Sequence, residues 1–129
     1  MRPVDAGEAL DELTRLSAEI ENAAILDLSG AVRAWTLDAD ADRLSRAAAE
    51  LLDVAAVVHP ERTVDRVDVQ LSRGAVFVVQ AGGHVAAATT GPEPPAALVV
   101  HDLRACLGRM GAAPFLVPER NPTADPVDA

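Results

Sequence analysis

The sequence contains no lysine, and all 11 of its basic residues are arginine. A Walker A loop needs a lysine on the β- and γ-phosphates, and Schiff-base or pyridoxal-phosphate enzymes need one for their covalent bond. The Gly-x-Ser-x-Gly elbow of hydrolases is also missing around every serine. These absences exclude P-loop nucleotidases, lysine-dependent enzymes and elbow-type hydrolases.

Cysteine, aromatic residues and positive charge are also scarce. The single cysteine, Cys106, provides no disulfide framework, which favours a reducing cytoplasm. Acidic residues outnumber basic ones by 20 to 11, giving a net charge of −9, and the aromatic residues are only Trp35, Phe77 and Phe115. Nucleic acids and anionic membranes repel such a chain. Its apolar runs are too short for membrane insertion, and its amino terminus lacks the order of a secretory signal.

Three aspartates imitate the start of an EF-hand, but the rest of that calcium loop is missing. Asp38, Asp40 and Asp42 have the right spacing. The loop then needs a glycine and, at its twelfth position, a glutamate, where this chain has Arg43 and Ala49. These aspartates are better explained as helix-capping residues.

The histidines offer no metal site or catalytic pair. His59, His84 and His101 have no partner at metal-ligand spacing. A nucleophilic pair of Cys106 with His101 lacks a third group to orient the histidine, and a cysteine beside an apolar helix face usually packs as a small hydrophobe. We therefore expect no catalytic residue, no metal and no cofactor.

The length of 129 residues fits one domain. Apolar spacing and turn signals predict a domain over residues 1–110 and a proline-rich, disordered tail over 111–129. A capping pattern from Asp5 to Glu8 starts the first helix, whose apolar stripe is Leu10, Leu13, Leu16 and Ile20. The expected elements are a helix ending near Asn22, strands 23–28 and 31–37, a helix 40–58, strands 64–71, 75–81 and 84–90, and a helix 96–110.

This order, α-β-β-α-β-β-β-α, with hairpin signals between successive strands, predicts an α+β fold. The sheet should be five-stranded and antiparallel, with helices on both faces, as in profilin-like proteins.

The second helix has more apolar surface than one sheet contact requires. At 100° per residue its apolar positions spread over roughly 220°, whereas a sheet-packed helix needs about 100°. Alanine is a good helix former and needs no partner, but the leucines and valines of this helix remain unexplained. We therefore expect a homodimer interface along a seam of mostly small residues, Ser45, Ala49, Leu52 and Ala56, together with the neighbouring Ala48.

The strand 64–71 is the second expected part of the interface. An unpaired edge strand invites association, so two copies could pair antiparallel across a two-fold axis. With the axis at Val67, Arg66 would lie opposite Asp68 of the other copy. Val67 would face its own copy, and Val69 would also belong to the interface.

Several local patterns resemble the Roadblock family, named for a dynein light chain. Residues 24–32 (Ala-Ile-Leu-Asp-Leu-Ser-Gly-Ala-Val) resemble its first hairpin, residues 67–80 its third and fourth strands, and the break at 92–95 the approach to its last helix. The resemblance covers about residues 10–110. It implies dimers formed through the second helix and third strand, no catalytic site, and a role beside Ras-like GTPases in bacteria.

The expected function is therefore a non-enzymatic homodimeric module that scaffolds or regulates a Ras-like small GTPase, or another signalling protein. The alternative is a PAS-like or profilin-like domain that senses a small molecule, which would need a cavity with convergent polar groups. A helical extension found in some GTPase-activating relatives is replaced here by the proline-rich tail.

Overall fold

The computed structural model describes residues 3–36 and 40–111. The expected tail beyond residue 111, and Asp38 of the capping segment, lie outside these ranges. The elements are α1 (Ala6–Leu16), β1 (Ile20–Asp27), β2 (Val32–Trp35), α2 (Ala41–Val58), β3 (Arg66–Leu71), β4 (Gly74–Ala81), β5 (His84–Thr90) and α3 (Ala96–Met110).

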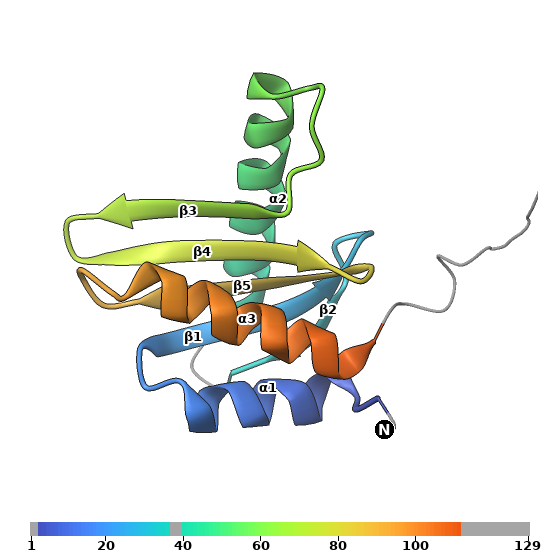
Figure 1. The fold of residues 1–129 in the computed structure, drawn as a ribbon, viewed down its shortest axis with the longest axis vertical. Coiled ribbons are helices and arrows are strands. Elements are labelled where there is room, and N and C mark those ends of the chain that lie inside the picture. The colour runs from blue at the N-terminus through green and yellow to red at the C-terminus, as the bar shows by residue number, and fades with distance from the viewer. Residues whose placement is uncertain (1–2, 37–39, 112–129) are drawn as a thin grey trace, which may run out of the picture.

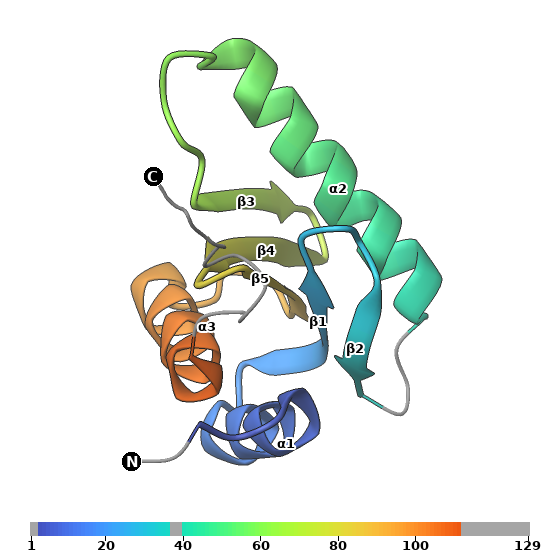
Figure 2. The same cartoon turned by 90° about the vertical axis from the view of Figure 1, so that its right-hand side faces the viewer.

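The strands form one antiparallel sheet in the order β2-β1-β5-β4-β3. Helix α2 lies on one face, and α1 and α3 lie on the other (Figures 1 and 2). The predicted element order, the antiparallel sheet and the placement of helices on both faces are confirmed. Within the described residues, no helix is both long enough and apolar enough to cross a membrane.

Polar groups fix the starts of the first two helices as predicted. The Asp5 carboxylate accepts a hydrogen bond of 2.8 Å from the Glu8 backbone N–H, and Asp40 accepts one of 3.1 Å from Arg43. Each carboxylate satisfies an N–H that has no partner inside its helix. Helix α2 ends at Val58, as predicted.

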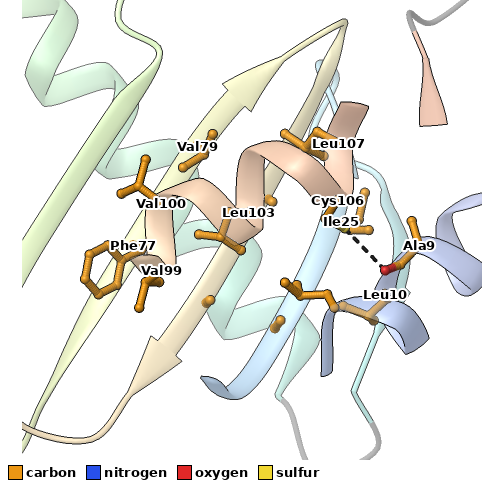
Figure 3. Close-up of a cluster of buried hydrophobic side chains, with 14 of the residues drawn as sticks. Ala9, Leu10, Ile25, Phe77, Val79, Val99, Val100, Leu103, Cys106 and Leu107 are labelled. Atoms are coloured by element: carbon orange, nitrogen blue, oxygen red, sulfur yellow. Dashed lines mark hydrogen bonds between the residues drawn. The ribbon is translucent and has the colours of Figure 1, made fainter. Parts of the chain in front are cut away.

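The larger core lies between the sheet and the pair α1 and α3 (Figure 3). Phe77, Leu103 and Leu107 are almost completely buried there. Cys106 is buried too, and its thiol lies 3.5 Å from the Ala9 carbonyl oxygen, which links α3 to α1. Burial raises the pKa of Cys106 to about 11. The cysteine is thus a packing residue, as the sequence indicated.

The smaller core lies under α2. Paired strand residues form a row, Ala24–Ala87–Val78–Val67, on this face. The first three are fully buried, and Val67 at the sheet edge is half-buried against the same cluster. Leu44 and Ala48 are the buried residues of α2. The helix therefore passes over this row.

Several predicted boundaries are wrong, and two of them matter most. The first helix ends at Leu16 and not near Asn22, and Ile20 opens β1, where it pairs with Thr90. The helical spacing continued to Ile20 by coincidence, because an apolar residue at that position also suits a strand beside the core. Leu16, expected on the buried stripe, is 64% exposed. Strand β2 is shorter than expected and covers Val32–Trp35.

Candidate interaction surface

Among residues 3–36 and 40–111, no strand pairs with the outer edge of β3, which presents backbone N–H and C=O groups. Gln80 donates its backbone N–H to the Asp65 carbonyl oxygen, so residues 65, 67, 69 and 71 direct their N–H and C=O groups toward β4. The groups of Arg66, Asp68 and Gln70 therefore point away from the sheet. An edge of six residues in this state is a template for another strand.

Helix α2 extends beyond this edge. Figures 1 and 2 both show its carboxyl-terminal turns projecting past β3. No residue after Ala48 in this helix is fully buried. Val54, Val57 and Val58 are 61%, 79% and 63% exposed. Such apolar groups on a projecting helix are unusual for a surface that only meets water.

The apolar arc of α2 contains two stripes, one on each side of the line of contact with the sheet. The hairpin-side stripe consists of Ser45, Ala49, Leu52 and Ala56. Its first three residues line a hollow with Leu26, Leu28 and Val85, close to the β1–β2 and β4–β5 turns. The β3-side stripe consists of Ala47, Leu51, Val54 and Val58. Its first three residues line a hollow over Val69 and Val76.

The floor beside the β3-side stripe is a row of paired residues that α2 leaves uncovered. The row runs Asn22–Thr89–Val76–Val69 across four strands. On each strand it lies two residues away from the buried row under α2, on the same face of the sheet. All four residues are only half-buried. The hollows along this side of α2 share Ala47 and Val76, so they form one continuous groove.

The predicted interface residues of α2 fall into three groups. Ala49 and Ala56 are exposed, and Leu52 is half-buried. Ser45 donates its hydroxyl to the Gly30 carbonyl oxygen at 3.1 Å, which ties α2 to the β1–β2 turn. Ala48 is 2% exposed and belongs to the subunit's own core, so we remove it from the surface available to a partner.

The four predicted β3 residues alternate between the two faces of the sheet. Val67 and Val69 lie on the α2 face. Arg66 and Asp68 lie on the opposite face and form an ion pair within the strand, with Arg66 Nη2 2.8 Å from Asp68 Oδ2. From the sequence, Arg66 and Asp68 were expected to pair only between copies. The residues of the β3-side stripe were not among those predicted, although their 4, 3, 4 spacing equals that of Ser45, Ala49, Leu52 and Ala56.

Asp27 organises the turn beside the hairpin-side hollow. Its carboxylate accepts hydrogen bonds from the Ser29 hydroxyl (2.5 Å) and from the backbone N–H groups of Ser29 and Ala31, and Arg33 lies 3.1 Å away. The Ser29 hydroxyl bond is the main reason that the pKa of Asp27 lies below its ordinary value; burial opposes this shift. This aspartate is part of the hairpin pattern noted in the sequence, and here it has a structural role.

Solved structures share this arrangement. A Roadblock/LC7 domain from Streptomyces avermitilis has a TM-score of 0.70 at 23% identity, covering 81% of this chain and 93% of that one. The gliding protein MglB from Thermus thermophilus has a TM-score of 0.68 at 18% identity, covering 85% and 95%. An MglB with tetrameric arrangement has a TM-score of 0.61 at 20% identity, covering 85% and 94%.

Profilins in complexes with rabbit actin match as well, with TM-scores of 0.59, so the fold alone does not select a partner. No protein-family model and no curated protein sequence matches this chain. The order of elements, the sheet and the positions of its helices give the chain the fold of the bacterial Roadblock/LC7 domains.

Proposed function

We propose that this protein is a bacterial member of the Roadblock family, a non-enzymatic homodimer that scaffolds or regulates a complex of a Ras-like small GTPase. The observation that carries the proposal is the projection of an apolar α2 past the open β3 edge. A second copy would cover both the open β3 edge and the projecting turns of α2. Its own β3 would pair with the edge, and its sheet would lie under the projecting turns.

The energetics favour self-association through α2. Fully burying one valine side chain contributes roughly 1.5–3 kcal/mol. Val54, Val57 and Val58 together would supply on the order of 3–6 kcal/mol from each copy, before the costs of association are subtracted. Micromolar affinity requires about 8 kcal/mol. An ion pair on the strand would add at most about 1 kcal/mol. The self-association of at least one MglB with this fold is consistent with the proposal.

The GTPase assignment rests on the likeness to MglB and Roadblock/LC7 structures together with the sequence resemblance to the Roadblock family. The single, buried cysteine suits a reducing cytoplasm, where we place the complex. The acidic net charge of −9 favours a protein partner over nucleic acid.

A ligand-sensing function receives less support. A sensor of the PAS-like or profilin-like type would enclose its ligand between the sheet and a helical layer. Here the space between the sheet and α3 is filled by side chains such as Phe77, Leu103 and Val99, each 0% exposed. The packed core therefore favours a protein-interaction module over a ligand-sensing domain.

The proposal is tested by affinity capture from a lysate of the source organism, with GDP or a non-hydrolysable GTP analogue added. We expect a Ras-like GTPase to be enriched and then to bind the purified protein directly in a titration. The isolated protein should not hydrolyse GTP. Enrichment of other proteins only, or turnover that tracks this chain through further purification, would refute the assignment.

A further inference from the structure

We propose that residues 115–117 of this chain, Phe-Leu-Val, dock in the hairpin-side hollow of the same copy. The inference goes beyond the proposed function and depends neither on the homodimer nor on a GTPase. It gives a role to the only run of three large apolar residues after Gly111. For these three residues it replaces the disordered tail expected from the sequence.

The hairpin-side hollow has a mainly apolar floor that α2 does not cover. The floor consists of paired residues of β1, β5 and β4: Leu26, Val85 and Gln80. The wall is α2, where Ala49 is exposed and Leu52 is half-buried. The volume is about 210 Å³, whereas an apolar cavity of ~150 Å³ holds a benzene molecule. The hollow is therefore large enough for the phenyl ring of Phe115 and part of a neighbouring side chain.

The tail leaves α3 at the end of the sheet where this hollow opens. Figure 1 shows the carboxyl end of α3 at the same end of the sheet as the β1–β2 and β4–β5 turns. This helix end is held in place, because Val4 donates its backbone N–H to the Arg109 carbonyl oxygen at 3.0 Å. Gly111 then has a φ of 74°, a left-handed conformation that lets the chain turn away from the helix. The tail therefore starts from a defined point.

The hollow lies within reach of residues 115–117. Helix α3 and the hollow lie on opposite faces of the sheet (Figure 2). Packed layers are about 10 Å apart, so the chain has to cross on the order of 10–20 Å around the ends of the hairpins. At about 3.3–3.6 Å per residue, the chain from Gly111 spans about 13–14 Å to Phe115 and about 20–22 Å to Val117. The first large apolar residues of the tail therefore arrive at the hollow.

The segment suits a contact within one copy. Prolines at 114 and 118 flank the apolar residues and favour an extended chain, which lowers the entropy lost on docking. Docking removes the side chains of Phe115, Leu116 and Val117 from water. A short tether gives such a segment an effective concentration in the millimolar range, far above that of a separate protein. The tail of the same copy is therefore the favoured occupant, and any other protein that binds this hollow has to displace it.

Chymotrypsin cleavage of the Phe115–Leu116 bond in the native full chain measures docking. The wild type is compared with a synthetic peptide of residues 111–121 and with two variants at exposed helix alanines, Ala49→Glu in the hollow and Ala105→Glu on α3. The wild type and Ala105→Glu should be cleaved at least about tenfold more slowly than the peptide, because only the released segment is cut. Ala49→Glu should be cleaved about as fast as the peptide, because docking would bury an unpaired charge.

Disulfide trapping reports which copy supplies the segment. Leu116→Cys combined with Ala49→Cys should form a disulfide under mild oxidation, in a product with the mass of one chain. Leu116→Cys combined with Ala97→Cys, an exposed position at the opposite end of α3, should not form this product. The native Cys106 is buried and does not compete for oxidation.

Several results would overturn the inference. The first is a wild type that is cleaved as fast as the free peptide, a comparison that needs no variant to fold. Release of the segment by both glutamate substitutions, or by neither, would also refute docking in this hollow. A disulfide between two chains would assign the segment to another copy, and no disulfide at all would remove the contact. Circular dichroism checks the folding of each variant. None of these results decides whether the protein is a homodimer or binds a GTPase, so the two proposals fail separately.

Discussion

Arg66 and Asp68 form an ion pair within a single strand, with Arg66 Nη2 2.8 Å and Nε 3.2 Å from the same carboxylate oxygen of Asp68. Both side chains lie on the face opposite α2, and both backbones direct their free groups to the open edge. The pair neutralises the edge where two copies would meet. If the two-fold axis passed through Asp68, the Asp68 carboxylates of the two copies would lie opposite each other, but each would already be paired with its own Arg66.

The first prediction is a charge swap at this pair. Arg66→Asp should raise the dissociation constant of the dimer by up to about fivefold. The substitution replaces an exposed ion pair, which contributes about 0.2–1 kcal/mol, by two carboxylates that repel each other. Adding Asp68→Arg should restore it, as measured by light scattering. A double variant no better than the single one would show that the pair has no role at the edge.

The second prediction uses two glycines. A Cβ on Gly74 would overlap the Thr90 carbonyl oxygen, whereas a Cβ on Gly108 would meet nothing within 4 Å. Gly74→Ala should therefore lower the free energy of unfolding by about 1–3 kcal/mol through overpacking. Gly108→Ala in α3 should raise it by up to about 1 kcal/mol through helix propensity. Urea unfolding of both at one protein concentration provides the check; equal effects would contradict the close approach at Gly74.

The third prediction concerns acid. The pKa of Asp27 is lowered in the folded protein, mainly by the Ser29 hydroxyl. In the unfolded chain the pKa of an aspartate is about 3.9. The stabilising contribution of the carboxylate is therefore complete above that pH, and it is lost as the pH falls through the lower folded value.

Asp27→Asn should lower the free energy of unfolding at pH 7 by about 1.5–3 kcal/mol, the usual contribution of hydrogen bonds to a charged group. The difference from wild type should shrink at pH 3. Asp11→Asn, on the exposed side of α1, is the matched control and should change little. A deficit of the same size at both pH values would mean that the charge of Asp27 does not stabilise the turn.

The fourth prediction concerns thiol reactivity. Cys106 is 0% exposed and its pKa is raised to about 11 by burial, from 9.0. The thiolate is the reactive form, and a rise of this size lowers its population about 100-fold. Iodoacetamide at pH 8 should modify the native protein at least about 100 times more slowly than the urea-unfolded chain. Rapid native labelling would indicate that α1 does not stay docked on α3.

Local signals predicted most of this fold, and long-range packing decided what they missed. The caps at Asp5 and Asp40 and the turn between the strands predicted over 75–81 and 84–90 are local, and each is where the sequence indicated. The end of α1 is not local, because Ile20 suits both a helical stripe and a strand. Its pairing with Thr90, far away in the sequence, decides between them.

The orientation of α2 on the sheet could not be predicted from the sequence for the same reason. The excess of apolar surface on α2 follows from composition and helical period alone. Which stripe meets the sheet depends on where the helix crosses it: Ala48 is buried while its neighbour Ala49 is exposed. The spacing of residues along α2 contains no information about the position of β3, so the two stripes could not be separated.

The central claim, that two copies form the working unit, is tested most directly by the mass of the wild-type protein in solution. One chain has a mass of 13.4 kDa. Light scattering at micromolar concentration should give about twice that value, and the mass should fall toward one chain only on strong dilution. A constant mass of one chain up to high micromolar concentration would contradict the account.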